Sequence, residues 1–357
     1  MPCTLSHHQL TQLCEKVEQG HLLTHAEVLE LVQLDEQQAP MLFACADRIR
    51  QREVGNDIHL RGLIEFSNIC IRQCQYCGLY CKNKNVDRYR MKEDEIFETA
   101  ELAQQMGYPS LVLQSGEDPY YNAKRLAMVI KRIKNVLGVA ITLSAGEFTR
   151  DEYQLLHDAG VDRYLLRFET SDEQLYRKLH PDSELVERLK CLDYLTETGY
   201  QVGTGFMVGL PGETPEVFAN NLLLLKKYNV GMVGIGPFLS NPDTPLSAAP
   251  NGTVLATLKA VAITRLLLPD TNIPATTALG TLDKIGREKA LQAGANVIMP
   301  NVSPMRFREL YKLYPNKMCV TADQGRAAAI TLVESLGRTV GTTKGHAPLR
   351  RNNTNAE

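Results

Sequence analysis

From Ile58 onward, short apolar runs alternate with segments whose apolar residues have helical spacing. Several of the helical segments end at a glycine suited to a left-handed cap: Gly107, Gly160, Gly199 and Gly294. Such alternation predicts a parallel sheet covered by helices, and eight repeats predict an α/β protein with a closed (β/α)8 TIM barrel. A doubly wound open sheet is the weaker alternative, because no dinucleotide-type glycine loop opens the first helix.

The expected strands are Ile58–Phe66, Ser110–Gln114, Val139–Ser144, Arg163–Arg167, Gln201–Val208, Met232–Phe238, Ile273–Ala278 and Asn296–Met299. The expected helices between them are Lys92–Met106, Asn122–Leu137, Arg150–Ala159, Glu184–Thr198, Pro215–Tyr228, Val254–Leu267 and Lys284–Ala293, with Arg306–Leu313 after the last strand.

Two segments flank this repeat. Residues 1–54 are expected to form an N-terminal helical extension, since Thr24 and Glu27 have the spacing of a capping box and a second helix fits Ala39–Arg52. Residues 55–320 would form the barrel. Residues 321–357 would form a C-terminal helix, from about Asp323 to Leu336, and a polar disordered tail from about Gly341.

Polar and glycine-rich sequences follow most of the expected strands. Because active sites of such barrels lie at the carboxyl ends of the strands, these sequences are expected to meet at one face. They are the cysteine stretch 70–77, Gln114-Ser-Gly-Glu-Asp-Pro119, Ser144-Ala-Gly-Glu147, Arg167-Phe-Glu169, Met207-Val-Gly-Leu-Pro-Gly-Glu213, Pro237–Pro245 and Pro274-Ala-Thr-Thr277.

Cys70, Cys74 and Cys77 follow the first strand at the spacing C-x3-C-x2-C, with Tyr76 before the third cysteine. This spacing lets one loop wrap three thiolates around a cubane iron–sulfur cluster. Such clusters normally have four protein ligands, so three cysteines imply one iron open for chemistry. A zinc site is the alternative, with Cys81 as fourth ligand.

Charge and cysteine content narrow the classes of function. The net charge is −2, with 39 basic and 41 acidic residues and no long run of one sign, which argues against nucleic-acid or acidic-membrane partners. No apolar run approaches a membrane span, and Met1 to Gly20 lacks a signal core. Nine cysteines, an odd number, with four crowded into residues 70–81, predict a reduced cytoplasmic protein whose cysteines serve metal or redox chemistry.

The cysteine loop with Tyr76 resembles the signature of the radical S-adenosylmethionine (SAM) superfamily. That resemblance implies one 4Fe–4S cluster on the three cysteines, with SAM on the open iron and reductive cleavage to a 5′-deoxyadenosyl radical. It further implies that Glu169 binds the ribose hydroxyls, Arg188 binds the methionine carboxylate, and Ser115-Gly-Glu117 lies beside the methionine amino group. Taken alone, each of these residues also fits an ordinary structural role. The implied cofactor-binding residues are Tyr76, Ser115, Glu117, Ser144, Glu169, Arg188, Met207 and Leu239.

A narrower resemblance covers residues 58–319, which are similar to the HydE family of iron-only (FeFe) hydrogenase maturases. It rests on motifs such as Ile64-Glu-Phe-Ser-Asn68, Arg88-Tyr-Arg90, Leu113-Gln-Ser-Gly-Glu-Asp-Pro-Tyr-Tyr121 and Ala295-Asn-Val-Ile-Met-Pro-Asn301. It implies assembly of the hydrogenase di-iron centre from a small anionic iron–cysteine complex with carbonyl and cyanide ligands, in company with maturation proteins and an electron donor. The implied substrate residues are Gln114, Thr142, Arg167, Met232, Pro274, Thr276 and Thr277. For Thr276 and Thr277, filling of the barrel is the competing role.

The chain also departs from that family. Phe168 stands where members often have histidine, which suggests an altered inner pocket. Cys319 is present but Asp323–Arg338 contains no cysteine, so no second cluster is expected. Two alternatives stay open: a related radical enzyme on an organic substrate, resembling methylornithine synthase or biotin synthase, and a non-enzymatic zinc or iron–sulfur scaffold.

Overall fold

The computed structural model describes residues 5–317 and 319–348. Its first three helices are α1 (His7–Glu18), α2 (His25–Val32) and α3 (Ala39–Val54). The capping box predicted at Thr24 is confirmed: the Thr24 hydroxyl accepts from the Glu27 N–H, and the Glu27 carboxylate accepts from the Thr24 N–H at 2.7 Å. Ser6 caps α1 in the same way through Gln9.

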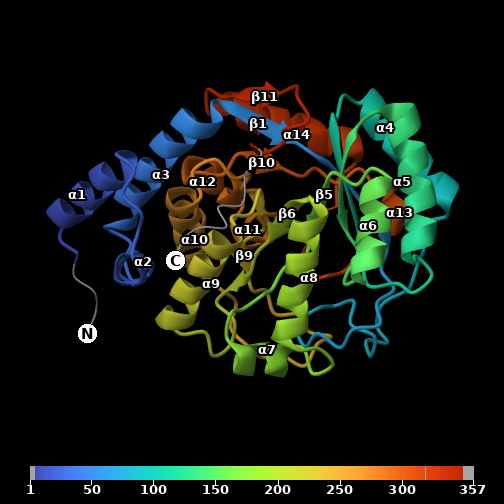
Figure 1. The fold of residues 1–357 in the computed structure, drawn as a ribbon, viewed down its shortest axis with the longest axis horizontal. Helices are drawn as coiled ribbons and strands as arrows, with labels where there is room; N and C mark the ends of the chain where they lie inside the picture. The colour runs from blue at the N-terminus through green and yellow to red at the C-terminus, as the bar shows by residue number, and fades with distance from the viewer. Residues whose placement is uncertain (1–4, 318, 349–357) are drawn as a thin grey trace.

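The strands lie in the middle of the barrel with helices on both sides of them (Figure 1). Six of them pair in parallel in the order β2-β3-β4-β5-β6-β8, while β1 pairs with β10 and β7 with β9. Single bridges close the ring, from Met232 to Asn272, from Pro274 to Val297 and from Leu63 to Asn301. The predicted (β/α)8 barrel is therefore confirmed. The strands are β1 (Asp57–Leu60), β2 (Gly62–Ser67), β3 (Ser110–Ser115), β4 (Ala140–Ser144), β5 (Arg163–Leu165), β6 (Gln201–Thr204), β7 (Met207–Val208), β8 (Met232–Val233), β9 (Gly236–Pro237), β10 (Val297–Ile298) and β11 (Thr339–Gly341).

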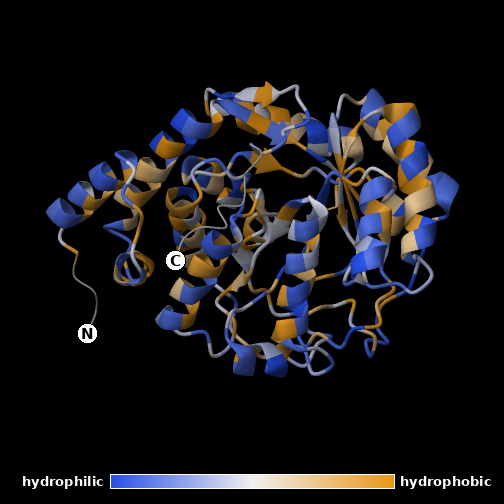
Figure 2. Ribbon diagram, in the orientation of Figure 1, coloured by the Kyte–Doolittle hydropathy of each residue, from blue (hydrophilic) through white to orange (hydrophobic). Residues whose placement is uncertain are grey.

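Helices cover the outside of the ring with apolar residues inward and polar residues outward (Figure 2). On α5, for example, Leu126, Ile130 and Ile133 are buried; Asn122 caps its start and Gly138, in the left-handed conformation, ends it. The remaining helices are α4 (Glu93–Gln105), α5 (Ala123–Leu137), α6 (Arg150–Asp158), α7 (Glu173–Leu179), α8 (Leu185–Thr198), α9 (Pro215–Tyr228), α10 (Val254–Leu267), α11 (Thr277–Leu282), α12 (Gly286–Gln292), α13 (Met305–Arg308) and α14 (Ala322–Ser335).

Several expected elements were predicted too long. In place of a strand over Ile273–Ala278 the structure has only single bridges, at Asn272 and Pro274, and Thr277 begins α11 with Thr276 as its extended N-cap residue. The strands expected over Gln201–Val208 and Met232–Phe238 are each interrupted, as β6 and β7 and as β8 and β9. The helix expected over Arg306–Leu313 is only α13, Met305–Arg308. There the Arg308 guanidinium donates to the carbonyls of Asn301 (2.6 Å) and Ser303 (2.9 Å), which holds the chain back against the barrel.

Helices α2 and α3 pack on α10, which is buried on nearly all sides, and α1 packs on α3. In Figure 1 they project from the barrel beside α9 and α10. The ammonium group of Lys259 on α10 donates to the carbonyls of Val32 (2.5 Å) and Leu34 (2.7 Å). The end of α2 and the loop that follows it are thereby bonded to the barrel through the buried side chain of Lys259.

The segment after α14 closes the amino-terminal end of the barrel. Strand β11 pairs in parallel with β1, and both lie beside α14 on the side of Figure 1 opposite α7. Beyond β11, the carbonyl of Lys344 accepts from Arg163 (2.7 Å) and that of Gly345 from Arg61 (3.1 Å), and Ala347 is buried. The expectation of a disordered tail from Gly341 is thus wrong for residues 341–348, because buried arginines bind their backbone carbonyls. Residues 349–357 lie outside the described residues.

Of the helices in the described residues, none combines the length and the apolar character that crossing a membrane requires.

Candidate active site

The three cysteines lie on the loop between β2 and α4 and line one cavity of about 300 Å³ at the carboxyl ends of the strands. Burial raises the pKa of Cys74 well above its usual value, and burial together with the neighbouring Cys70 raises that of Cys77 to about 12. Thiols in such surroundings need a bound cation to become thiolates. Cys81 is exposed and is not among the lining residues.

The three thiols could bind either a single zinc ion or an iron–sulfur cluster, and the two kinds of centre require different spacings of the sulfur atoms. Within residues 5–317 and 319–348, no three His, Cys, Asp or Glu side chains are grouped closely enough to hold one metal ion. Ligands of a single zinc ion stand about 2.3 Å from it, whereas thiolates on separate corners of a cubane are farther apart. Three loop cysteines around one cavity are the donor set that a 4Fe–4S cluster with one open iron requires.

Gly116 lets the loop after β3 lie directly against the cysteine loop. A Cβ atom at this position would stand 2.3 Å from the carbonyl oxygen of Ile69 and 2.7 Å from Cβ of Cys70. The two loops are also joined by hydrogen bonds from the Gly116 N–H to Ser67 O (3.0 Å) and from the Ile71 N–H to Glu117 O (3.1 Å). Ser115 and Glu117 thereby line the same cavity as the cysteines.

A chain of alternating charges runs along one wall of the cavity. Arg72, inside the cysteine loop, pairs with Glu117 (2.6 Å) and with Glu147. Glu147 also pairs with Nε of Arg188 (2.6 Å), whose guanidinium donates to the Arg167 carbonyl (3.0 Å). Burial raises the pKa of Glu117 although Arg72 and Arg188 act to lower it. Four loops or helices of the barrel mouth are linked by these charges.

Arg72 and Glu147 were not predicted as site residues. Arg72 was visible as a cation between two cysteines, and Glu147 as a carboxylate three residues after the end of β4. Neither position by itself indicates which partner the side chain chooses, since the pairing exists only once the loops meet.

Glu169 lies after β5 and pairs with Arg167 at 2.6 Å. Its backbone has φ 67°, in the left-handed region, which only Asn229 and Asn316 share among the described non-glycine residues. Such a conformation costs a residue with Cβ about 1 kcal/mol and is found mainly where function requires it. The strand end at Phe206 and Met207 fixes it, through a bridge and a hydrogen bond from the Met207 N–H to the Glu169 carbonyl (3.2 Å).

Another part of the cavity lining is apolar. Met207 belongs to a small buried cluster with Leu175, Leu179, Leu210 and Phe238, and Tyr76 packs against it. The Tyr76 hydroxyl is 2.9 Å from Nε2 of His180, whose Nδ1 faces the Tyr176 carbonyl at 3.2 Å. Since Nδ1 must donate to that carbonyl, Nε2 accepts from Tyr76. Burial and the nearby Arg188 lower the pKa of His180 to about 3, so the ring stays neutral.

The structure brings most predicted site residues to this cavity. Those that line it are Cys70, Cys74, Cys77, Tyr76, Ser115, Glu117, Ser144, Glu169, Arg188, Met207, Leu239, Gln114, Arg167 and Thr276. Thr142, Met232, Pro274 and Thr277 do not line it. Thr142, Met232 and Pro274 are buried in the barrel, and the Thr277 hydroxyl accepts a hydrogen bond from Arg287 (3.1 Å).

Phe168 is not part of the cavity lining either. Its side chain is fully buried in the core, and its ring lies 6.0 Å from that of Phe206 with the planes nearly parallel. The suggestion that Phe168 alters the inner pocket is therefore not supported: the residue points away from the mouth although Arg167 and Glu169 on either side line it.

A protein-family model and several characterised proteins match this chain. Residues 64–225 match the family model of the Radical SAM superfamily. The chain is 52% identical over 302 residues to the [FeFe] hydrogenase maturase subunit HydE of Thermotoga maritima, covering 84% of this chain and 86% of that protein. It is 32% identical to the 3-methylornithine synthase of Methanosarcina acetivorans over 81% of this chain and 82% of that one.

A solved structure, that of methylornithine synthase (PylB), superposes with a TM-score of 0.80 at 27% identity, covering 92% of this chain and 97% of that one. Members of the matched superfamily use a 4Fe–4S cluster and SAM. The cavity agrees with this, because three loop cysteines line it together with both charged and apolar side chains. The protein belongs to the radical SAM superfamily.

Proposed function

We propose that the protein is a radical SAM maturase that acts in assembly of the di-iron centre of FeFe hydrogenase. Cys70, Cys74 and Cys77 would hold the 4Fe–4S cluster and leave one iron for SAM. When bound, the cluster supplies the electron that cleaves SAM to a 5′-deoxyadenosyl radical. The proposal is supported by the identity to HydE over most of both chains.

The charged and the apolar parts of the cavity lining suit the two halves of SAM. Arg188 offers a guanidinium fork for the methionine carboxylate, and Glu169 offers an acceptor for the ribose hydroxyls. Ser115, Glu117 and Ser144 are assigned to the neighbourhood of the methionine amino group, while Tyr76, Met207 and Leu239 form the apolar side for adenine. Arg167 and Glu147, which now pair with these groups, would stay to hold them in place.

One observation carries the assignment of the substrate end. Arg167 Nε, Thr276 Oγ1 and Thr142 Oγ1 are buried polar atoms without a hydrogen-bond partner in the described part of the chain. Unpartnered donors are costly unless a ligand satisfies them. Together with Gln114, which lines the same cavity, Arg167 and Thr276 would orient a small anionic iron complex with carbonyl, cyanide and cysteine ligands. Thr142, Met232, Pro274 and Thr277 lie outside the cavity lining and would act through these residues.

The partners follow from this activity: an electron donor for the cluster and other hydrogenase-maturation proteins. We further propose a cytoplasmic location, supported by the cysteines of the described residues, which are all free thiols.

The test is an anaerobic hydrogenase-maturation assay with apo-hydrogenase and the other maturation components, in which this protein is present or omitted. Hydrogen production should require the protein and should fail with Cys74→Ala. Full activation without the protein would contradict the proposal.

A second function is favoured by the fold likeness to methylornithine synthase, which extends over nearly all of both chains. In that case SAM would still be cleaved while hydrogenase stayed inactive. The 32% identity to 3-methylornithine synthase ranks this function below the maturase at 52%.

A further inference from the structure

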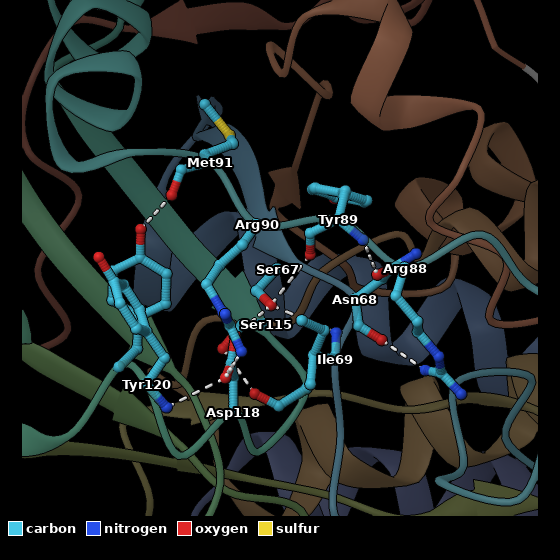
Figure 3. A network of polar contacts seen from close by, with 12 residues as sticks. Ser67, Asn68, Ile69, Arg88, Tyr89, Arg90, Met91, Ser115, Asp118 and Tyr120 are labelled. Atoms are coloured by element: carbon cyan, nitrogen blue, oxygen red, sulfur yellow. Dashed lines mark hydrogen bonds and ion pairs between the residues drawn. The ribbon is translucent and has the colours of Figure 1, made fainter.

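The two arginines of the Arg88-Tyr-Arg90 motif have different partners (Figure 3). Arg90 forms a two-point ion pair with Asp118, at 2.6 and 2.8 Å, so its charge is balanced. Arg88 binds only backbone carbonyl oxygens: Asn68 (2.7 Å), Leu79 (2.8 Å), Tyr80 (2.8 Å) and Asn83 (3.2 Å). In the described part of the chain no carboxylate pairs with its guanidinium.

Those four carbonyls belong to the two ends of the cysteine loop. Asn68 precedes Cys70 by two residues, and Leu79, Tyr80 and Asn83 follow Cys77. The Asn68 side chain adds three hydrogen bonds at the start of the loop. It donates to Asp87 O (2.8 Å) and Leu310 O (2.9 Å) and accepts from the Tyr89 N–H (2.7 Å; Figure 3). A single half-buried guanidinium therefore joins the entry and exit of the loop.

The unbalanced charge also lies near a cysteine. The Leu79 N–H donates to Sγ of Cys77 at 3.4 Å, and the carbonyl of the same residue is bonded to Arg88. The Leu79 backbone therefore lies between this sulfur and the guanidinium, and a positive charge on that side favours negative charge on the sulfur.

We propose that Arg88 is a positioning residue for the cysteine loop and that its unbalanced charge raises the reduction potential of the cluster. This inference rests on the proposed function, since it needs an iron–sulfur cluster on the three cysteines. A reduced cluster carries one more negative charge than the oxidised one, so a nearby cation that no carboxylate neutralises favours the reduced form. Arg88 is not assigned to the reacting atoms.

The experiment compares wild type with Arg88→Lys, Arg88→Gln and Lys84→Gln after anaerobic reconstitution. Midpoint potentials are measured by redox titration followed by electron paramagnetic resonance. Arg88→Gln should lower the ratio of reduced to oxidised cluster at a fixed potential about tenfold, which is about 59 mV for one electron. Lys84→Gln removes the same charge from an exposed side chain of the same loop and should change the ratio by less than about twofold.

Arg88→Lys separates charge from geometry. Its ammonium group keeps the charge but cannot reach all four carbonyls, so the potential should stay near wild type while a chelator removes iron several-fold faster. An Arg88→Gln protein with wild-type potential and an intact cluster would overturn the electrostatic role. Equal rates of iron loss in all four proteins would overturn the positioning role.

A measurement on the cluster-free protein separates this inference from the proposed function. Amide hydrogen exchange at Leu79–Asn83 should be faster in Arg88→Gln than in Lys84→Gln, whatever metal the cysteines bind. If the wild type takes up no iron–sulfur cluster, the proposed function and the effect on potential both fail. The exchange result then decides the positioning role alone, and unchanged exchange would overturn it.

Discussion

The two ends of the barrel treat buried arginines in opposite ways. At the mouth, Arg72, Arg167 and Arg188 pair with the carboxylates of Glu117, Glu147 and Glu169. At the base, Arg61 and Arg163 are completely or almost completely buried and form no ion pair in the described residues. They donate instead to the carbonyls of Gly345 and Lys344 and to neutral side chains such as Ser110 (3.0 Å).

This difference separates an end of the barrel that is open to a ligand from one that is not. At the mouth the paired side chains line a cavity, so a carboxylate or hydroxyl of a ligand can bond to them while the ion pairs stay in place. At the base the acceptors are backbone carbonyls of the segment after β11, so a ligand could not take their place without moving that segment. The mouth is therefore expected to determine binding, and the base to determine stability.

Cys74→Ala is the largest expected effect at the mouth. Loss of one of three cluster ligands should reduce SAM cleavage to background, because the family retains only three cysteines for the cluster. The free energy of unfolding should change by less than about 1 kcal/mol, since the residue contributes one small thiol to the cavity lining. The measurements are 5′-deoxyadenosine yield and urea unfolding of the cluster-free protein. A normal yield would remove Cys74 from the cluster.

Arg163→Met tests the base. Its guanidinium donates to Ser110, Gln201 and Lys344 and faces His346 at 3.0 Å, so removing it leaves buried acceptors unpaired. The free energy of unfolding should fall by about 3 kcal/mol, while SAM binding by the folded protein should stay within about threefold.

Arg48→Met is the matched control for that variant. Arg48 is exposed on α3 and pairs with Glu18, so the same substitution should cost less than about 1 kcal/mol. Equal losses in urea unfolding for the two variants would show that the base is no more sensitive than the surface.

The same comparison explains what the sequence could predict. Alternating apolar runs and helices identify the barrel, because they follow from the periodicity of each element. The sequence does not predict that residues 342–348 close the base. These residues are polar and include a glycine, and they bind the buried arginines through backbone carbonyls, which every residue type has.

At the mouth, a cysteine motif or a strand-end carboxylate is recognisable from its residue type and position, so Cys70, Glu117 and Glu169 were predicted to lie at this face, and all three line the cavity. Partners of those residues are harder to predict. Arg72, Glu147 and His180 matter because of which side chain they meet, and that depends on how three separate loops pack. Phe168 illustrates the opposite error: it follows a site residue in sequence, yet its ring turns into the core.

Glu169 offers a smaller and more selective effect at the mouth. Glu169→Ala and Glu169→Gly both remove the carboxylate and should weaken SAM binding about thirtyfold, roughly 2 kcal/mol for a charge-assisted hydrogen bond. Because φ is 67°, glycine should make the folded protein about 1 kcal/mol more stable than alanine. Isothermal titration gives the affinity and urea unfolding the stability. An unchanged dissociation constant would remove Glu169 from the ribose role.

The smallest effect is a pH dependence that the mouth contributes through His180. Its pKa is lowered to about 3, first by burial and then by Arg188, whereas an unfolded histidine titrates near 6.5. Below pH 6.5 the unfolded chain therefore binds a proton that the folded one does not, and stability is lost as the pH falls towards 3. At pH 5.5 the expected cost from this residue is about 1.4 kcal/mol.

His180→Gln should remove that part of the dependence, so its urea-unfolding free energies at pH 7.5 and 5.5 should differ by about 1.4 kcal/mol less than those of wild type. His8→Gln, on the exposed side of α1, is the matched control and should keep the wild-type difference.

His59 at the base provides a second comparison, because burial, followed by the charge of Arg61, lowers its pKa to about 4. His59→Gln should reduce the pH dependence of stability without changing SAM affinity, whereas His180→Gln also loses the acceptor that orients Tyr76 and should weaken SAM binding. Equal SAM affinities in the two variants would break the distinction between mouth and base.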